Sequence, residues 1–188
     1  MPPATVYTRD QILDAALAVI EEGGLEALSA RRVADEFGGS PSPVYSHFDS
    51  IDELAFETLK RARDLLAEYT TRPYTERPFL NMGTGVALFA RDHSNLYRAL
   101  YLEGDRFEDL TTEFLGHLRE DMRRDRRFTD LSAEDRGALL WKMWIFTHGL
   151  ASLIAVGLHE ETEQDDIVET LVDVGSAIIP RSRGVREA

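Results

Sequence analysis

The stretch GGSPSPVYSHFDSIDEL, Gly38 to Leu54, decides how the N-terminal part of this 188-residue chain folds. Its two prolines, at positions 41 and 43, would end most helices, but here they can begin one. Ser40 is a good N-cap, which places Pro41 at the first helical position, where a missing N–H costs nothing. Pro43 still falls within the first turn, whose N–H groups have no intrahelical partner. We therefore predict a short helix from Pro41 to His47.

Two further helices are predicted before this stretch. Thr8 and Gln11 form a capping box, and apolar residues then recur at helical spacing as far as Gly23-Gly24. Ser29 can cap a second helix, which the Gly38-Gly39 pair ends. A helix, a glycine turn and a short helix, supported by the first helix of the chain, make a helix-turn-helix. The second helix of such a pair enters the DNA major groove.

The remainder of the chain is also predicted to be helical. Ser50 and Glu53 form a second capping box, and the helix that they begin carries apolar residues as far as Tyr69. Pro180 closes the last helix. No segment shows convincing strand alternation, so we predict an all-α protein of about nine helices. After the break from Arg72 to Pro78, the helices are expected at 79–92, 95–103, 106–125, 133–158 and 165–179.

Composition is typical of one globular protein. The chain is 43% hydrophobic and has no cysteine, which excludes disulfides and thiolate metal sites. The N-terminus lacks the basic start and apolar run of a secretory signal. The apolar window Leu139 to Leu158 is about as long as a membrane span, but it contains Lys142 and His148, and charged helices flank it. We therefore expect a buried helix, no membrane association and a cytoplasmic protein, with no metal and no cofactor.

Charge argues in two directions about a nucleic-acid partner. The net charge of −13 disfavours DNA, because phosphate contacts need lysine or arginine. Residues 38–48, however, contain no acid, and a helix N-terminus can hold a phosphate through its amides. The basic run from Arg123 to Arg127 could suggest a second nucleic-acid patch. Its position at a helix C-terminus favours a solvated end instead.

Residues 8–54, TRDQILDAALAVIEEGGLEALSARRVADEFGGSPSPVYSHFDSIDEL, resemble the DNA-binding domain of the TetR family of transcriptional regulators. The segment WIFTHGLASL, Trp144 to Leu153, is similar to a C-terminal subclass of that family with Trp and then His-Gly. The resemblance implies a helix-turn-helix domain over 1–53 and an effector-binding and dimerisation domain over 54–188. It also implies a homodimer that binds a palindromic double-stranded DNA operator, most often as a repressor, and a small-molecule effector that releases it.

The family pattern also implies which residues contact DNA. The family usually has lysine on a DNA phosphate where this chain has Ile51, so one charge-assisted contact is lost. Base readout would rest on Ser42, Ser46 and an apolar contact from Pro43 or Val44 to a thymine methyl. The DNA-binding residues expected in all are Ser29, Arg31, Arg32, Ser40, Ser42, Pro43, Tyr45, Ser46 and His47.

Several of these residues have a structural alternative. Phe48 fits a core position better than a DNA contact, and Tyr45 fits a phosphate contact better than the core. His47 is equally compatible with a phosphate neighbour and with a solvated surface histidine.

The C-terminal part should supply a cavity and a dimer interface. Aromatic residues and imidazoles on the middle helices are candidates for the cavity. They include no lysine or arginine, so a mainly apolar, neutral or weakly cationic effector is favoured. The expected ligand-binding residues are Tyr69, Phe89, Tyr97, Tyr101, Phe114, His117, Trp141, Trp144 and His148. The expected dimer-interface residues, on the last two helices, are Leu150, Leu153, Ile154, Ile167, Leu171, Val174 and Ile178.

Two other functions compete with a ligand-responsive regulator. The first is an enzyme, because several histidines lie among many carboxylates. No two of them have metal-site spacing with a third ligand nearby, and no nucleophile motif occurs, so we expect no catalysis. The second is a small-molecule-binding or interaction protein whose helix-turn-helix no longer binds DNA. Ile51 and the acidic balance favour this alternative.

Overall fold

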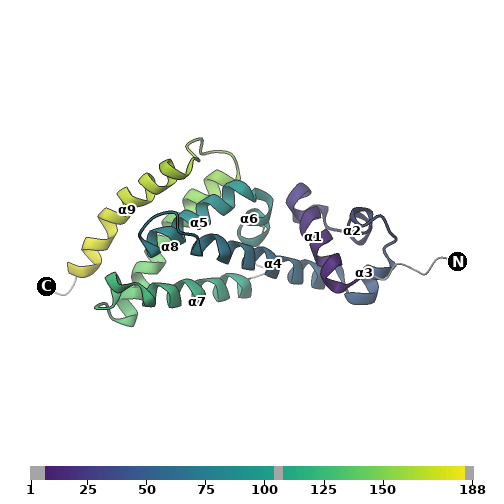
Figure 1. Cartoon of the computed structure of the whole chain (residues 1–188), viewed down its shortest axis with the longest axis horizontal. Helices are drawn as coiled ribbons and strands as arrows, with labels where there is room; N and C mark the ends of the chain where they lie inside the picture. The colour runs from purple at the N-terminus through teal and green to yellow at the C-terminus, as the bar shows by residue number, and fades with distance from the viewer. Residues whose placement is uncertain (1–6, 104–107, 185–188) are drawn as a thin grey trace.

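The chain folds into an elongated helical molecule with a small head and a larger body (Figure 1). A computed structural model describes residues 7–103 and 108–184, and these contain nine α-helices, two short 3-10 helices and no strand. This confirms the predicted all-α class and the N-terminal helix-turn-helix. The helices are α1 (Arg9–Gly23), η1 (Leu25–Ala27), α2 (Ala30–Glu36), α3 (Ser42–His47), α4 (Ile51–Thr71), α5 (Pro78–Asp92), α6 (Ser94–Tyr101), α7 (Glu108–Arg124), η2 (Arg126–Phe128), α8 (Ala133–Ala155) and α9 (Gln164–Gly184).

The caps predicted for the head helices are present. Thr8 accepts a hydrogen bond from the Gln11 N–H, and the Gln11 side chain accepts one from the Thr8 N–H, so the capping box is complete. The Ser29 hydroxyl caps α2 by accepting from the Arg32 N–H at 3.3 Å. Such caps satisfy N–H groups that the first turn leaves without partners. They explain why these helices begin where the sequence predicted.

Helix α3 begins one residue later than predicted. Its N-cap is Pro41 rather than Ser40, and Pro43 therefore lies in the first turn at its second position. The Val44 N–H donates to the Pro41 carbonyl at 3.1 Å, which makes Pro41 the residue that closes the first turn. The physical argument for tolerating the prolines still applies, because an N–H in the first turn has no intrahelical acceptor to lose.

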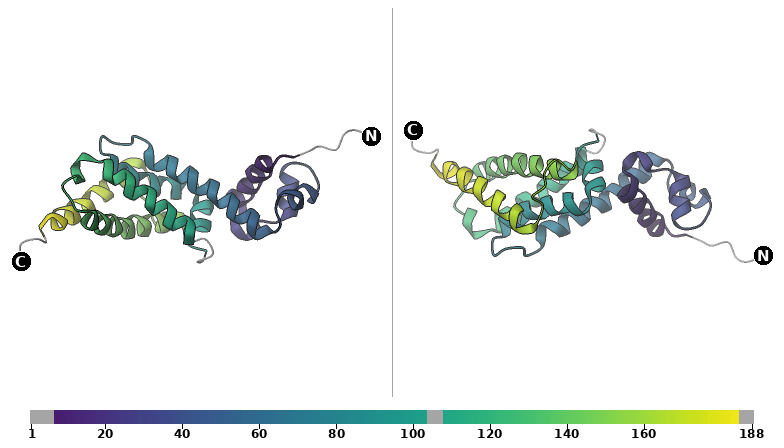
Figure 2. Two further views of the ribbon diagram at one scale, coloured as in Figure 1. Left: turned by 90° about the horizontal axis from the view of Figure 1, so that it is seen from below. Right: turned by 90° about the horizontal axis from the view of Figure 1, so that it is seen from above.

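Helix α4 connects the head with the body. It starts directly after α3 and runs 21 residues into the centre of the molecule (Figures 1 and 2). The predicted domain boundary between residues 53 and 54 therefore lies inside one continuous helix. Arg61 on α4 forms ion pairs with Asp10 and Asp14 on α1, and these pairs hold the head against the helix.

Helix α5 lies at the centre of the body and packs against α4, α6, α7, α8 and α9. Its approach to α4 is close at Gly85. A Cβ atom at this position would lie 2.3 Å from the Tyr69 carbonyl oxygen. Glycine is therefore required here by backbone proximity, because any side chain would overlap the main chain of α4.

Helices α8 and α9 complete the body. Ser132 caps α8 through the Asp135 N–H, as predicted. Helix α8 is long and apolar enough to cross a membrane by length and composition, with 44% of its most apolar window buried inside the body. Helix α9 continues past Pro180, which was expected to end it. Ile178 and Ile179 pack against the core just before the proline.

Candidate nucleic-acid interface and ligand cavity

Helix α3 has a buried side and an exposed side. Val44 and Phe48 face inward and are 1% and 3% exposed, whereas Tyr45 is 62% exposed. Ser42, Ser46 and His47 are also exposed and carry no negative charge. The buried pair fixes how the helix sits, and the exposed side presents hydroxyl and imidazole groups to solvent. This arrangement suits a helix that reads a surface.

The two sides decide several alternatives left by the sequence. Phe48 is a core residue, with the guanidinium of Arg9 4.7 Å from the centre of its ring. Tyr45 is not a core residue. Its exposure is compatible with the predicted contact with a DNA phosphate, which stays a prediction. Val44 is buried and cannot reach a thymine methyl. Of the two candidates for that contact, only the half-buried Pro43 remains accessible.

Tyr7 ties the chain before α1 to the helix-turn-helix. Its hydroxyl donates to the Phe37 carbonyl at 3.0 Å, and the two rings lie 4.2 Å apart. The His47 Nε2 atom lies 3.0 Å from the Tyr7 carbonyl oxygen. The contact with the Tyr7 carbonyl thus orients the His47 ring, although His47 remains exposed to solvent. Sequence reasoning missed Tyr7, although an apolar residue directly before a capping box is a known signal for such a packing role.

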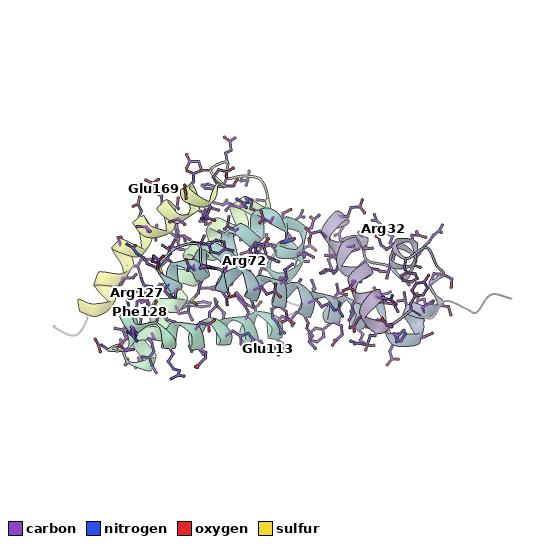
Figure 3. The ribbon with its side chains drawn as sticks, in the orientation of Figure 1. Arg32, Arg72, Glu113, Arg127, Phe128 and Glu169 are labelled. Carbon is purple, nitrogen blue, oxygen red and sulfur yellow. The ribbon has the colours of Figure 1, made fainter. Side chains whose placement is uncertain are left out.

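The N-terminal end of α2 carries the nearest predicted cations. Arg31 and Arg32 are exposed, and Arg32 makes a 4.0 Å ion pair with Glu22. Arg32 is labelled in the head in Figure 3. Ser40 is exposed in the turn between α2 and α3. Ile51, at the position where the family usually has lysine, is half-buried and packs against the core. Ile51 therefore contributes to packing and cannot supply the positive charge that the lysine usual in the family would carry.

A polar cluster joins the head to the body. The His93 Nδ1 atom lies 3.1 Å from the Glu21 carboxylate on α1. On the other side of the ring, the His93 Nε2 atom lies 3.2 Å from the Tyr69 hydroxyl, which donates to Asp92 at 3.1 Å. The Asn95 side-chain amide donates to the Glu21 carbonyl at 2.9 Å. We call Glu21, Tyr69, Asp92, His93 and Asn95 the junction cluster.

Burial and hydrogen bonds shift two pKa values in the junction cluster. Burial raises the pKa of Tyr69, and its hydrogen bond to the Asp92 carboxylate raises it further. Burial alone would raise the pKa of Asp92, but hydrogen bonds from Arg91 and Tyr69 outweigh it and lower that pKa. Asp92 therefore stays ionised and Tyr69 stays protonated at neutral pH, so the hydrogen bond between them is charge-assisted.

Most of the predicted ligand-binding aromatics pack against one another. Trp144 stacks on His148 with ring centres 5.4 Å apart, and Tyr101 lies edge-on to Trp144 at 5.6 Å. The Tyr97 hydroxyl and the His148 Nδ1 atom are 2.6 Å apart. Burial lowers the pKa of His148, which keeps the ring neutral. Phe114 packs against Trp144, and Phe89 is buried beside Tyr69.

A cavity of about 330 Å³ lies between α5, α8 and α9, next to these aromatics rather than among them. Trp144 is the one predicted ligand-binding residue in its described lining, which also includes Arg77 and Arg127, two cations that the predicted set lacked. A second, smaller cavity is lined by Phe114 and His117. Described residues that line the larger cavity are Arg77, Phe79, Leu80, Met82, Gly83, Val86, Leu118, Arg127, Leu140, Met143, Trp144, Thr147, Leu171, Val172, Gly175, Ser176 and Ile179.

The predicted dimer-interface residues divide between core and surface. Leu150, Ile154, Ile167 and Leu171 are buried within the single chain, so they have little area left for a partner. Val174 and Ile178 are half-buried and Leu153 is exposed. The amphipathic stripes of α8 and α9 are thus used largely inside the monomer.

A different row of α8 is apolar and exposed. Trp141 is 54% exposed, which places it on the surface rather than in either cavity, and Ile145 and Leu153 are exposed as well. These three residues and Gly149 follow one another at intervals of four, which is one of the ridges that helices use to pack. Val156, one turn beyond Leu153, extends the exposed row. Such a row is typical of a surface that another helix covers.

No metal site is apparent in the part of the chain that the structure describes. It contains no group of three His, Cys, Asp or Glu side chains that could hold an ion. His93 and His148 are occupied by Glu21 and Tyr97 instead.

Comparison with known proteins agrees with this geometry. Residues 12–58 match the family model described as bacterial regulatory proteins, tetR family. A tetR-family transcriptional regulator from Streptomyces coelicolor has a TM-score of 0.79 at 19% identity, covering 95% of this chain and 83% of its own.

Two further solved structures are similar over nearly their whole length. A putative TetR-family regulator from Rhodococcus sp. has a TM-score of 0.67 at 19% identity and covers 90% of this chain and 97% of its own. MexZ, described as a key repressor responsible for antibiotic resistance in Pseudomonas aeruginosa, has a TM-score of 0.59 at 21% identity, with 93% and 94% covered. At these identities the likeness establishes the fold. No curated protein matches the chain.

Proposed function

We propose that this protein acts as a dimeric repressor. The premise is that its N-terminal domain belongs to the tetR family of bacterial regulatory proteins and that the whole chain has the fold of that family's solved structures. The dimer binds a palindromic DNA operator and releases it when a small, mainly apolar effector binds. The protein is a regulator rather than an enzyme, and we place its action in the cytoplasm, where bacterial DNA is. MexZ, one protein of the same fold, is a repressor.

The observation that carries the proposal is the exposed side of α3. Tyr45 and the polar residues beside it project from a helix whose other side is fixed by Val44 and Phe48. A rigid underside with an exposed row is what a recognition helix in a major groove requires. We infer that the exposed Arg31 and Arg32 at the start of α2 contact the flanking phosphates, which position a protein without reading sequence.

A dimer follows from the size of a single reading head. One six-residue helix contacts few base pairs, and two heads on half-sites about 34 Å apart are the usual solution. The exposed row of Trp141, Ile145 and Leu153 on α8 supports a two-fold interface there, since a row facing its own copy is self-complementary. We therefore revise the predicted interface toward this row and away from the buried Leu150 and Leu171.

Effector binding can be coupled to the head through α5. The cavity is lined by α5 residues as far along as Val86, and the same helix ends at Asp92 in the junction cluster. Seven residues beyond Val86, about 10 Å along the helix, His93 contacts Glu21 of α1. A ligand that shifts α5 would change this contact. Binding must favour one spacing of the heads over another, or it could not release DNA.

The experiment that tests DNA binding uses the region upstream of the protein's own gene. Fluorescence anisotropy should detect binding that weakens with salt, and Tyr45→Ala should weaken it about tenfold or more. Because Tyr45 is exposed, the thermal midpoint of this variant should change little. Leu158→Ala, which removes an exposed side chain just after the end of α8, is the control and should leave DNA binding unchanged.

The alternative is a small-molecule-binding or interaction protein with a degenerate helix-turn-helix. It is favoured by the absence of any lysine or arginine in residues 38–48 and by Ile51. If the chain binds neither its upstream region nor sequences selected from random DNA at low salt, the alternative replaces the proposal.

A further inference from the structure

The cavity between α5, α8 and α9 has walls of one chemical kind and a rim of another. Its walls are aliphatic and aromatic, with Phe79, Met82, Val86, Leu140 and Leu171 among them. Its volume of about 330 Å³ equals the space of about eleven water molecules, and it falls at the lower end of the range for small-molecule sites. The walls thus suit a compact apolar body.

Two arginines lie on the lining at the end of α5 where the helix begins. Arg77 is the residue directly before α5. Arg127 lies in η2, where the neighbouring Phe128 packs edge-on against Phe79 with ring centres 4.9 Å apart. Figure 3 shows Arg127 and Phe128 together at the end of the body away from the head. The cavity is therefore cationic at one end.

The charge at this end does not cancel. Arg127 is paired with Asp125 at 2.6 Å, and this aspartate is nearly buried. Among the described residues, Arg77 has no carboxylate partner, and no aspartate or glutamate lines the cavity. Because Arg127 is already paired with Asp125, Arg77 supplies the positive charge that a ligand can balance. That charge matches a ligand with a single negative one.

A third polar group lies deeper in the cavity. Thr147 is 4% exposed and lines the cavity. It lies 3.4 Å from the position of a Cβ at Gly83, six residues or about 9 Å along α5 from Arg77. The Thr147 oxygen is not among the buried polar atoms left without a partner, so it does not require a polar atom from the ligand and tolerates an apolar body.

We propose that the effector is a small apolar monocarboxylate, with its carboxylate at Arg77 and Arg127 and its apolar body along α5. This inference rests on the proposed function, since it names the effector class of that regulator. It replaces the preference for a neutral or weakly cationic ligand, which followed from a residue set without arginine. A cationic head would be repelled by the two guanidiniums, whereas a carboxylate at this partly solvated rim is stabilised without losing all of its water.

The test compares three compounds that differ only in the head group: 4-phenylbutyrate, 4-phenylbutanol and 4-phenylbutylamine. Each has about twelve non-hydrogen atoms, which suits the cavity, and at about pH 7.5 they are anionic, neutral and cationic. Isothermal titration of the full chain should show that the acid binds at least about tenfold more tightly than the other two. Equal or tighter binding of the alcohol or the amine, or no binding of the acid, overturns the proposal.

Matched variants locate the charge. Arg77→Gln, at an exposed position, should weaken binding of the acid about tenfold or more and leave the alcohol unchanged. Arg126→Gln removes an exposed arginine of η2 that does not line the cavity and should change neither. If the two variants behave alike, Arg77 does not hold the carboxylate and the assignment is wrong.

The titrations contain no DNA, so their result tests the effector class separately from DNA binding. A chain that binds DNA but prefers no carboxylate refutes the effector class alone. A chain that binds the acid through Arg77 but binds no DNA refutes the regulator alone.

Discussion

Replacing Gly85 by alanine should destabilise the protein because it places an atom where α4 and α5 nearly touch. The new Cβ would lie 2.3 Å from the Tyr69 carbonyl oxygen, 2.5 Å from the carbonyl carbon and 2.7 Å from the Thr70 Cα. All three are backbone atoms, so no side-chain rotation relieves the overlap. The two helices must therefore move apart, which loosens the packing between them.

The size of the effect follows from two opposing contributions. Ordinary contact begins near 3.4 Å, so the gap must widen by about 1 Å. Overpacking of this kind costs about 1–3 kcal/mol or more, and a backbone clash belongs at the upper end. Alanine returns up to about 1 kcal/mol through its helix propensity. We expect a net loss of about 2 kcal/mol in the free energy of unfolding, which lowers the thermal midpoint by roughly 4–8 °C.

Urea and thermal unfolding followed by circular dichroism measure this loss. The matched control is Gly83→Ala on the same helix, whose Cβ would meet only side-chain atoms of Leu171 and Thr147 at 3.4 Å. A second control, Gly116→Ala on α7, adds a Cβ with nothing within 4 Å and should stabilise by up to about 1 kcal/mol. The reasoning is refuted if Gly85→Ala is as stable as the unchanged protein or no worse than Gly83→Ala.

Three further predictions concern the dimer, the buried histidine and the missing lysine. Ile145→Glu should give folded monomers in sedimentation, whereas Leu171→Glu should unfold the body because Leu171 is buried. If the Ile145→Glu protein is still a dimer, the interface does not include Ile145. Burial lowers the pKa of His148, so the unfolded chain binds more protons and stability should fall as pH drops below about 6.5. Urea unfolding of His148→Gln at several pH values should show a flatter dependence. Ile51→Lys should tighten operator binding and steepen its salt dependence by about one unit of slope per half-site, and an unchanged slope would mean that this position does not face a phosphate.

Local signals in the sequence were sufficient for the head. The capping residues Thr8, Ser29 and Ser50 act on N–H groups three positions away, so their effect can be predicted without tertiary structure. The start of α3 was displaced by one residue because two prolines separated by Ser42 allow either register. The burial of Val44 could be expected only once the packing of α3 on the head was known.

Features that depend on how helices meet could not be predicted in the same way. Periodicity shows that α8 and α9 have apolar stripes, but not whether a stripe faces its own chain or a partner, so Leu150 and Leu171 were expected at a surface and are buried. The cavity lies where α5, α8 and α9 separate, and Arg127 reaches it from a distant turn. No sequence spacing brings these segments together.

The continuity of α4 has a mechanical consequence. A helix of 21 residues is about 31 Å long, and it starts beside the reading helix and ends near the junction cluster. If it tilts as a rigid rod, a rotation of about 5° at one end displaces the other by about 3 Å. In a symmetric pair the two displacements add, to about 6 Å, which is nearly two base-pair steps of DNA. An angular change that leaves every hydrogen bond of the helix intact is therefore enough to take two reading heads out of register with their half-sites.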